Sequence, residues 1–158
     1  MAQRPGFDMS KVSMNDKILL GVTAAFLIDS FLPWQRVCVS AGALGKVCGS
    51  ASAWGGSASW AGVLAGLASI LLLVTQIVPM LGAKVPPALA TVPTIAILAG
   101  ATAVFGILKF LLTLGNSAYL FGYIGLILAL AIAYYGWLHF RATQSPPMPP
   151  SAEPTSTA

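Results

Sequence analysis

The sequence predicts an all-α protein, an integral membrane four-helix bundle. Three long stretches carry almost no charge, each long enough to cross a bilayer, and a shorter fourth candidate precedes them. Composition agrees, because 57% of the residues are hydrophobic and 8% are charged, whereas about a quarter of the residues in a soluble domain are charged. Lipid offers no partner to exposed backbone groups, so such stretches cross it as helices. The expected spans are residues 18–34, 60–81, 89–114 and 118–140.

Residues 1–17, ahead of the first span, form an expected cytoplasmic segment. Lysine and arginine close to the spans favour the cytoplasmic side, and five of the eight basic residues fall on the side of this segment. Both termini are therefore expected in the cytoplasm. A rival interpretation treats Met1 to Ala43 as a cleaved secretory signal, which would leave three spans. The five residues are Arg4, Lys11, Lys17, Lys84 and Arg141, and the other three are Arg36, Lys46 and Lys109.

Asp29 and Lys109 are the only acid and base that these boundaries place inside the hydrocarbon. Asp29 lies five residues before Trp34 and Lys109 five before Leu114, so both sit roughly 7 to 8 Å below the outer boundary at about 1.5 Å per residue. An ion pair would relieve the cost of an unpaired charge in a span, roughly 2.5 to 3.5 kcal/mol. The alternatives are that each side chain snorkels to the outer headgroups, or that the two mark a path for protons or ions.

Residues 35–59 form the expected outer loop between the first and second spans. On the predicted topology its two cysteines, Cys38 and Cys48, face an oxidising compartment, so we expect a disulfide between them. Closing this short loop would contribute about 3 kcal/mol in the chain-entropy model. With inverted topology both would remain thiols. Trp54, a lone tryptophan among small residues, is expected either to anchor in the bilayer interface or to contact a partner.

Each expected span carries a stripe of small or polar residues at helical spacing. Small residues let helix backbones approach closely in lipid, where packing rather than the hydrophobic effect drives association. We therefore expect these faces to turn toward one another, the alternative being a solute path lined by them. One GxxxG pair is equally suited to dimerise two copies of the chain. The glycines expected at these packed faces are Gly62, Gly66, Gly106, Gly122 and Gly125.

Residues 141–158 form the expected cytoplasmic tail. From Thr143 the sequence TQSPPMPPSAEPTSTA is rich in proline, serine and threonine and has no large aliphatic pattern. Such a segment cannot bury enough apolar surface to offset the entropy lost on ordering. The tail is therefore expected to be disordered.

Two short motifs carry a resemblance. The first expected span ends in Phe31-Leu32-Pro33-Trp34, and Ala53-Trp54-Gly55 stands in the variable loop that follows. With three further spans, this arrangement resembles a group of uncharacterised small bacterial membrane proteins, mostly from actinobacteria, over roughly residues 18–140. That group has no established activity. The resemblance implies a bacterial plasma membrane and nothing catalytic.

The side chains offer little for catalysis, and neither an enzyme nor a cofactor or metal site is expected. His139 is the only histidine, so a histidine metal cluster or a Ser-His-Asp triad cannot be assembled. The segment from Gly42 to Lys46 lacks the spacing of a phosphate-binding loop. Basic residues are scattered singly along the chain, which argues against nucleic acid as a partner.

These observations favour a non-enzymatic accessory or scaffold subunit. Its expected partners are membrane lipids and a larger membrane assembly or further copies of itself. The alternative is a small transporter or channel component that uses Asp29 and Lys109. A quinone-linked thiol oxidoreductase is a third possibility, but it would need a second cysteine couple to pass electrons onward, and the chain has two cysteines in all.

Overall fold

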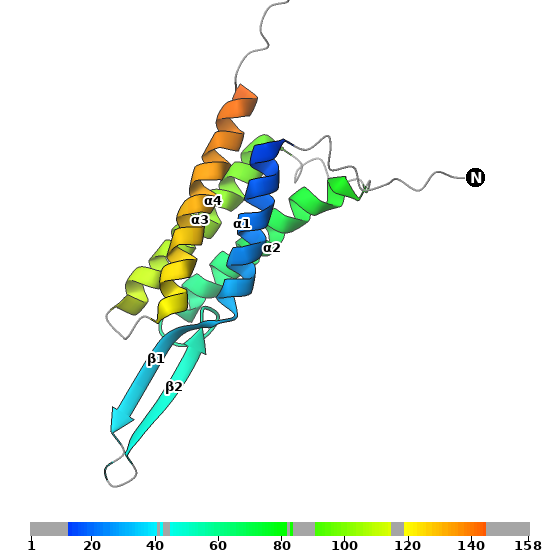
Figure 1. Ribbon diagram of the computed structural model, residues 1–158. Coiled ribbons are helices and arrows are strands. Elements are labelled where there is room, and N and C mark those ends of the chain that lie inside the picture. Colours follow the sequence, from blue (N-terminus) through cyan, green and yellow to red (C-terminus); the bar gives the residue numbers. More distant parts are fainter. Residues whose placement is uncertain are drawn as a thin grey trace, which may run out of the picture.

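Four helices lie side by side, and a β-hairpin projects from one end of them (Figure 1). This computed structural model describes residues 13–40, 42, 45–81, 83, 91–114 and 119–144. Helix α1 packs against α2 and α4, and α3 packs against the same two helices, so the four close a ring. The elements are α1 (Met14–Ser30), β1 (Pro33–Ser40), β2 (Lys46–Ser52), α2 (Ser59–Met80), α3 (Val92–Leu114) and α4 (Leu120–Gln144).

The predicted all-α fold is wrong, because part of the expected outer loop is an antiparallel hairpin of β1 and β2. Valine recurs at every second position here, at Val37 and Val39 in β1, and β-branched residues at such spacing favour strands. Near the turn, Gly42 and Gly45 have φ angles of 59° and 80°, which glycine adopts without steric cost. This alternation covers only a few residues, and the long uncharged runs on either side of it give a much stronger signal.

The prediction of four spans is also wrong, because three helices within the described residues are long and apolar enough to cross a membrane. Helix α1 is not among them. It has 17 residues, which at about 1.5 Å per residue give roughly 25 Å, less than the roughly 30 Å of a hydrocarbon core. Ser13 caps its start by accepting a hydrogen bond from the Asp16 amide at 3.2 Å. The three candidate spans are Ser59–Met80, Pro93–Leu114 and Leu120–Ala142.

Helix α1 ends earlier than predicted because of Pro33. A proline disfavours helical conformation in the residue before it, so a helix usually ends at or before that residue. The chain accordingly leaves the helix after Ser30, and Pro33 begins β1. This places Trp34 in a strand instead of at the end of a span.

At the other end of the chain, α4 continues through Gln144, so residues 141–144 of the predicted tail are helical. The remainder of that tail, residues 145–158, lies outside the described residues, as do residues 1–12 of the N-terminal segment. Lys84 and the first two residues of the predicted third span also lie outside them.

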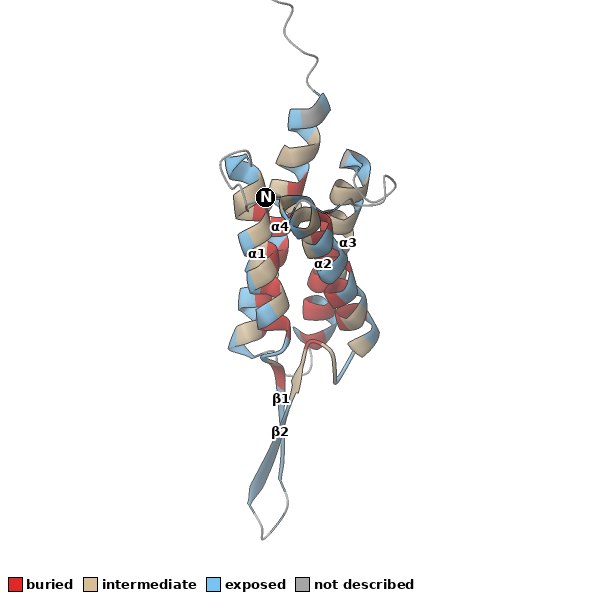
Figure 2. Cartoon of the chain, turned by 90° about the vertical axis from the view of Figure 1, so that its right-hand side faces the viewer, coloured by how far each residue is buried: buried red, intermediate tan, exposed pale blue. Residues whose placement is uncertain are grey.

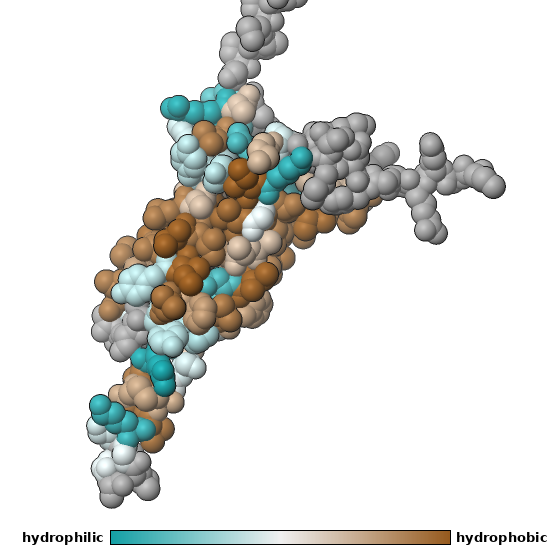
Figure 3. Space-filling model, in the orientation of Figure 1, coloured by the Kyte–Doolittle hydropathy of each residue, from teal (hydrophilic) through white to brown (hydrophobic). Residues whose placement is uncertain are grey.

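The interior of the helix ring contains large apolar side chains, several alanines and a number of buried polar side chains. Leu19, Phe26, Leu72 and Ile132 are almost fully buried, and buried residues line the inward side of each helix in Figure 2. The outward faces expose large aliphatic side chains, and Figure 3 shows them as a hydrophobic belt over the helices. Exposed apolar belts on helices of this length are typical of contact with lipid.

Candidate functional site: the hairpin and its anchor

The hairpin extends beyond the ends of the helices, so most of its residues are exposed (Figures 1 and 2). Cys38 lies directly opposite Cys48 across the two strands, and the two form a disulfide. The predicted disulfide is confirmed. It joins β1 to β2 between cysteines that are 10 residues apart in the sequence and therefore limits how far the hairpin can open.

The two faces of the hairpin differ in chemistry. Side chains alternate along a strand, and directly opposed residues share a face. Val39 is opposite Val47, and Val37 is on the same face two residues away, so this face is apolar. All three valines are exposed. The opposite face carries the disulfide and the cations Arg36 and Lys46.

Trp34 holds β1 against the helices. Its side chain is 1% exposed, and its indole N–H donates to the Asp29 backbone carbonyl at 3.0 Å and to Asp29 Oδ2 at 3.1 Å. The Trp34 ring meets Phe26 of α1 edge to face, with centroids 6.2 Å apart. The Trp34 carbonyl accepts a hydrogen bond from the Tyr119 amide at 2.9 Å. Through Trp34, the first strand is joined to the end of α1 and to the start of α4.

Lys109 holds the segment that follows β2. It lies in α3 and is completely buried. Its Nζ donates to the Gly55 carbonyl oxygen at 2.8 Å and also to that of Ser57. Backbone carbonyls thus replace the water that a buried ammonium loses. This lysine ties the last part of α3 to the loop that leads from the hairpin into α2.

Gln35 closes the base of the hairpin from the other side. It is 3% exposed, and its amide nitrogen donates to the Ser57 carbonyl at 3.1 Å while its amide oxygen accepts from the Ser57 amide at 3.2 Å. Both polar atoms of the side chain are therefore satisfied by one residue. Ser57 receives hydrogen bonds from both Gln35 and Lys109, so the two anchors meet on its carbonyl oxygen.

Trp54 is half-buried and contacts the end of α1 and the side of α2. Its indole N–H donates to Ser30 Oγ at 2.9 Å, and its ring stacks on Phe31 with centroids 5.5 Å apart. Its far edge lies against Gly66, where an added Cβ would overlap the ring. Trp54 is thus part of the attachment of the hairpin, while its two predicted roles, interfacial anchor or partner contact, stay predictions.

The predicted packing glycines lie close to other chain segments, some to the hairpin base and some to neighbouring helices. A Cβ on Gly62 would overlap the Ala53 carbonyl, and one on Gly125 would overlap the Trp34 ring. At Gly122 it would lie 3.4 Å from the Trp34 carbonyl oxygen. Gly106 lies between helices, with an added Cβ 3.1 Å from Phe26 of α1 and 3.3 Å from Ala129 of α4, and a Cβ on Gly122 would also lie 3.6 Å from Phe110 of α3.

The predicted ion pair between Asp29 and Lys109 is not formed. Within the described part of the chain, Asp29 is hydrogen-bonded to Trp34, and Lys109 to carbonyl oxygens of the loop before α2. The prediction rests on the equal depth of the two residues below the outer boundary. Equal depth does not determine which face of its helix each residue occupies. The hairpin and the loop that follows it supply partners for both side chains. A loop over residues 35–59 gives no reason to expect such partners.

The opposite end of the ring carries a contact that the sequence did not suggest. Asp16 Oδ1 of α1 lies 2.7 Å from His139 Nδ1 of α4. Both line a cavity of about 230 Å³ together with Gln76, whose amide oxygen is buried without a hydrogen-bond partner among the described residues. A separation of 123 residues hides such a pair from any local pattern.

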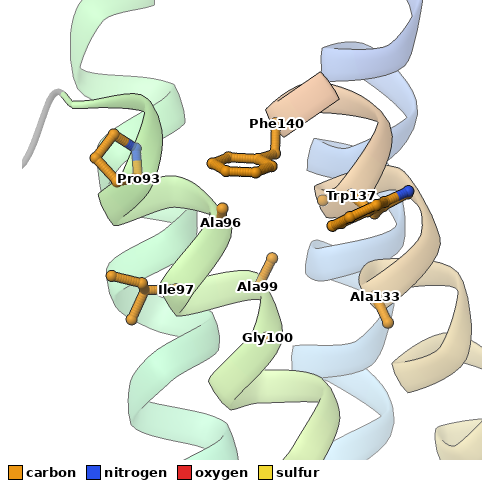
Figure 4. Close-up of a pocket in the computed structure, with 9 residues that line it drawn as sticks. Pro93, Ala96, Ile97, Ala99, Gly100, Ala133, Trp137 and Phe140 are labelled. Carbon is orange, nitrogen blue, oxygen red and sulfur yellow. The ribbon is translucent and has the colours of Figure 1, made fainter. Parts of the chain in front are cut away.

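A second cavity, of about 350 Å³, lies between α3 and α4 (Figure 4). Trp137 and Phe140 of α4 face Ala96 and Gly100 of α3 across it, and its walls are apolar. No titratable side chain lines it. It offers apolar contact and no reactive group.

The described residues hold no cluster of three or more His, Cys, Asp or Glu side chains that could bind a metal ion. Their polar groups at the hairpin end are engaged in holding the hairpin. What the arrangement can do is fix the position of a disulfide-closed hairpin relative to three apolar helices. Comparison of the chain with protein-family models, with curated proteins and with solved structures finds no match.

Proposed function

We propose that the protein is a non-enzymatic membrane protein that presents its hairpin, on the outer side of a bacterial plasma membrane, to a larger membrane assembly. It acts as an accessory or scaffold subunit. The hairpin offers one apolar face of three valines and one face with two cations, and a partner contacts the apolar face.

The observation that carries this proposal is the use of the buried polar residues. Burying a charge in an apolar interior is costly unless it is hydrogen-bonded. Asp29 and Lys109 are both buried, and both bond to the hairpin or to the loop that follows it. Two side chains that are costly to bury, Asp29 and Lys109, thus hold the hairpin in place. This supports a role for the hairpin itself.

The same observation weighs against a transporter or channel. A transported ion or proton needs an ionisable group that it can reach and leave. Lys109 is fully enclosed, with its ammonium bonded to two carbonyl oxygens, and the Asp29 carboxylate is covered by Trp34. A thiol oxidoreductase is disfavoured in turn because the two cysteines already form one disulfide and the chain has no others.

The arrangement of the ends supports the proposed orientation. Met14 at the start of α1 and Gln144 at the end of α4 lie at the end of the ring opposite the hairpin (Figure 1). The basic residues near that end favour the cytoplasm under the positive-inside rule. This supports an outer hairpin, where the disulfide is stable, and cytoplasmic termini.

Gentle extraction of the tagged full-length protein, followed by native-size analysis and mass spectrometry, tests the proposal. We expect a partner in fixed stoichiometry with the wild type. A Val37→Thr, Val39→Thr, Val47→Thr variant removes the apolar face while keeping β-branched side chains, and it should lose that partner.

A matched control changes the other face of the same strands. Ser40→Thr with Ser50→Thr adds methyl groups there, and it should retain the partner. Recovery of the wild type alone, as a monomer or homo-oligomer, would contradict the proposal. So would retention of the partner by the triple threonine variant with its disulfide intact.

A further inference from the structure

A polar depression of about 200 Å³ lies where the hairpin meets the helices. Two strands and the residue before α4 line it: Arg36 lies in β1, Ser50 in β2, and Tyr119 immediately precedes α4. The hydrogen bond from the Tyr119 amide to the Trp34 carbonyl holds the start of α4 against β1. The depression is therefore built by segments far apart in the sequence and fixed by the hairpin anchor.

The depression carries a positive charge that the protein does not balance. Within the described part of the chain, the Arg36 guanidinium has no ion pair or hydrogen bond, although Arg36 is directly opposite Ser50. No acidic residue occurs between Asp29 and Glu153, and Asp29 is buried against Trp34. An anion in this depression would meet no opposing carboxylate at the surface.

The groups that line it are those that bind phosphate. A guanidinium matches phosphate oxygens with two parallel hydrogen bonds, and the Ser50 and Tyr119 hydroxyls are further donors. Helix α4 begins at the next residue, Leu120, and the N-terminus of a helix adds a positive dipole end. Charge, donors and dipole all favour the same kind of ligand.

The position of the depression relative to the membrane favours a phospholipid as the source of the phosphate. The candidate span in α4 is Leu120–Ala142, so Tyr119 stands at the boundary between hydrocarbon and headgroups if α4 crosses the membrane. Tyrosine is typical of that level. A phosphate group is present there in every phospholipid.

We propose that Arg36, with the Ser50 and Tyr119 hydroxyls, binds the phosphate of an anionic phospholipid headgroup. The lipid then lies between the hairpin and the start of α4 and fixes the hairpin at the membrane surface. This proposal needs α4 to cross a membrane but does not depend on the scaffold function, so either can fail alone.

Native mass spectrometry of the delipidated full-length protein in detergent tests it. The probes are phosphatidylglycerol, phosphatidylcholine with the same acyl chains, and inorganic phosphate. We expect one phosphatidylglycerol to bind in preference to phosphatidylcholine. Arg36→Gln should weaken that binding by about tenfold, as for the loss of a charged hydrogen-bond donor, and Tyr119→Phe should weaken it less.

Lys46→Gln is the matched control. It removes the same charge from the same hairpin but at the turn end of β2, outside the depression, so binding should be unchanged. Equal losses in Arg36→Gln and Lys46→Gln would show nonspecific charge attraction and overturn the proposal, as would equal binding of the two lipids. Displacement of the lipid by millimolar inorganic phosphate would assign the site to a soluble anion and overturn the lipid assignment. An intact disulfide in each variant confirms that the hairpin has folded.

Discussion

At the scale of single residues, buried charge has a structural use in this protein. Lys109 replaces its lost hydration with two backbone carbonyls, and Asp29 accepts from an indole N–H. Neither arrangement needs the other charge. The two residues should therefore contribute to stability independently.

A double-mutant cycle on Asp29 and Lys109 tests that independence. Lys109→Met leaves the Gly55 carbonyl without its donor and the Ser57 carbonyl with Gln35 alone, and it should destabilise by about 1–3 kcal/mol. Asp29→Ala removes the side-chain acceptor of Trp34 and leaves the backbone one. Because the residues share no contact, their effects should add to within about 0.5 kcal/mol. Unfolding in detergent measures each variant, with exposed Lys46→Met as the control. A large coupling energy, or rescue by exchanging the two charges, would mean that they interact directly.

Glycine positions give a second test at this scale. An added Cβ at Gly125 would overlap the Trp34 ring, whereas at Gly100 it would meet nothing within 4 Å. Both lie inside helices. Gly125→Ala should destabilise by about 1–3 kcal/mol through overpacking, while Gly100→Ala should stabilise slightly because alanine favours helix by about 0.5–1 kcal/mol. Equal thermal shifts in the two variants would argue that Trp34 does not occupy this space.

At the scale of elements, the hairpin is held by two separate sets of contacts, one between its strands and one at its base. The disulfide joins its strands midway, and Trp34, Gln35 and Trp54 hold its base to the helices. Breaking the disulfide should loosen the pairing of the two strands and leave the contacts at the base intact.

Hydrogen exchange of a Cys38→Ser, Cys48→Ser variant measures this separation. Exchange should increase in residues 36–50, because loss of the cross-link leaves an isolated two-stranded hairpin, which is marginally stable in water. Helices α2, α3 and α4 should exchange as in the wild type. Faster exchange throughout the helices would show that the disulfide supports the whole fold.

Much at this scale could be read from the sequence, and the misses have physical causes. The three long apolar helices follow from their lack of charge, and the cysteine pair from its spacing. The hairpin was missed because a two-stranded sheet needs only a few alternating residues, a weaker signal than a span. The predicted span end at Trp34 is wrong because Pro33 favours an earlier end of the helix.

At the scale of the whole molecule, the buried groups at one end of the helix ring are arranged around the hairpin base. The anchors reach it from α1, from α3 and from the start of α4. Such long-range partners could not be predicted from sequence, because Lys109 and Gly55 are 54 residues apart. The pattern of one chain shows which residues are costly to bury but not what they bond to.

Hydrogen exchange of full-length wild type and Lys109→Met in the same membrane mimetic tests the central claim most directly, since the claim is that this buried charge fixes the hairpin base. The variant should exchange faster in residues 53–58 and at the base of the hairpin, with α3 as protected as before. Unchanged exchange at the hairpin base, or a loss of protection spread along α3 and α4, would contradict the claim.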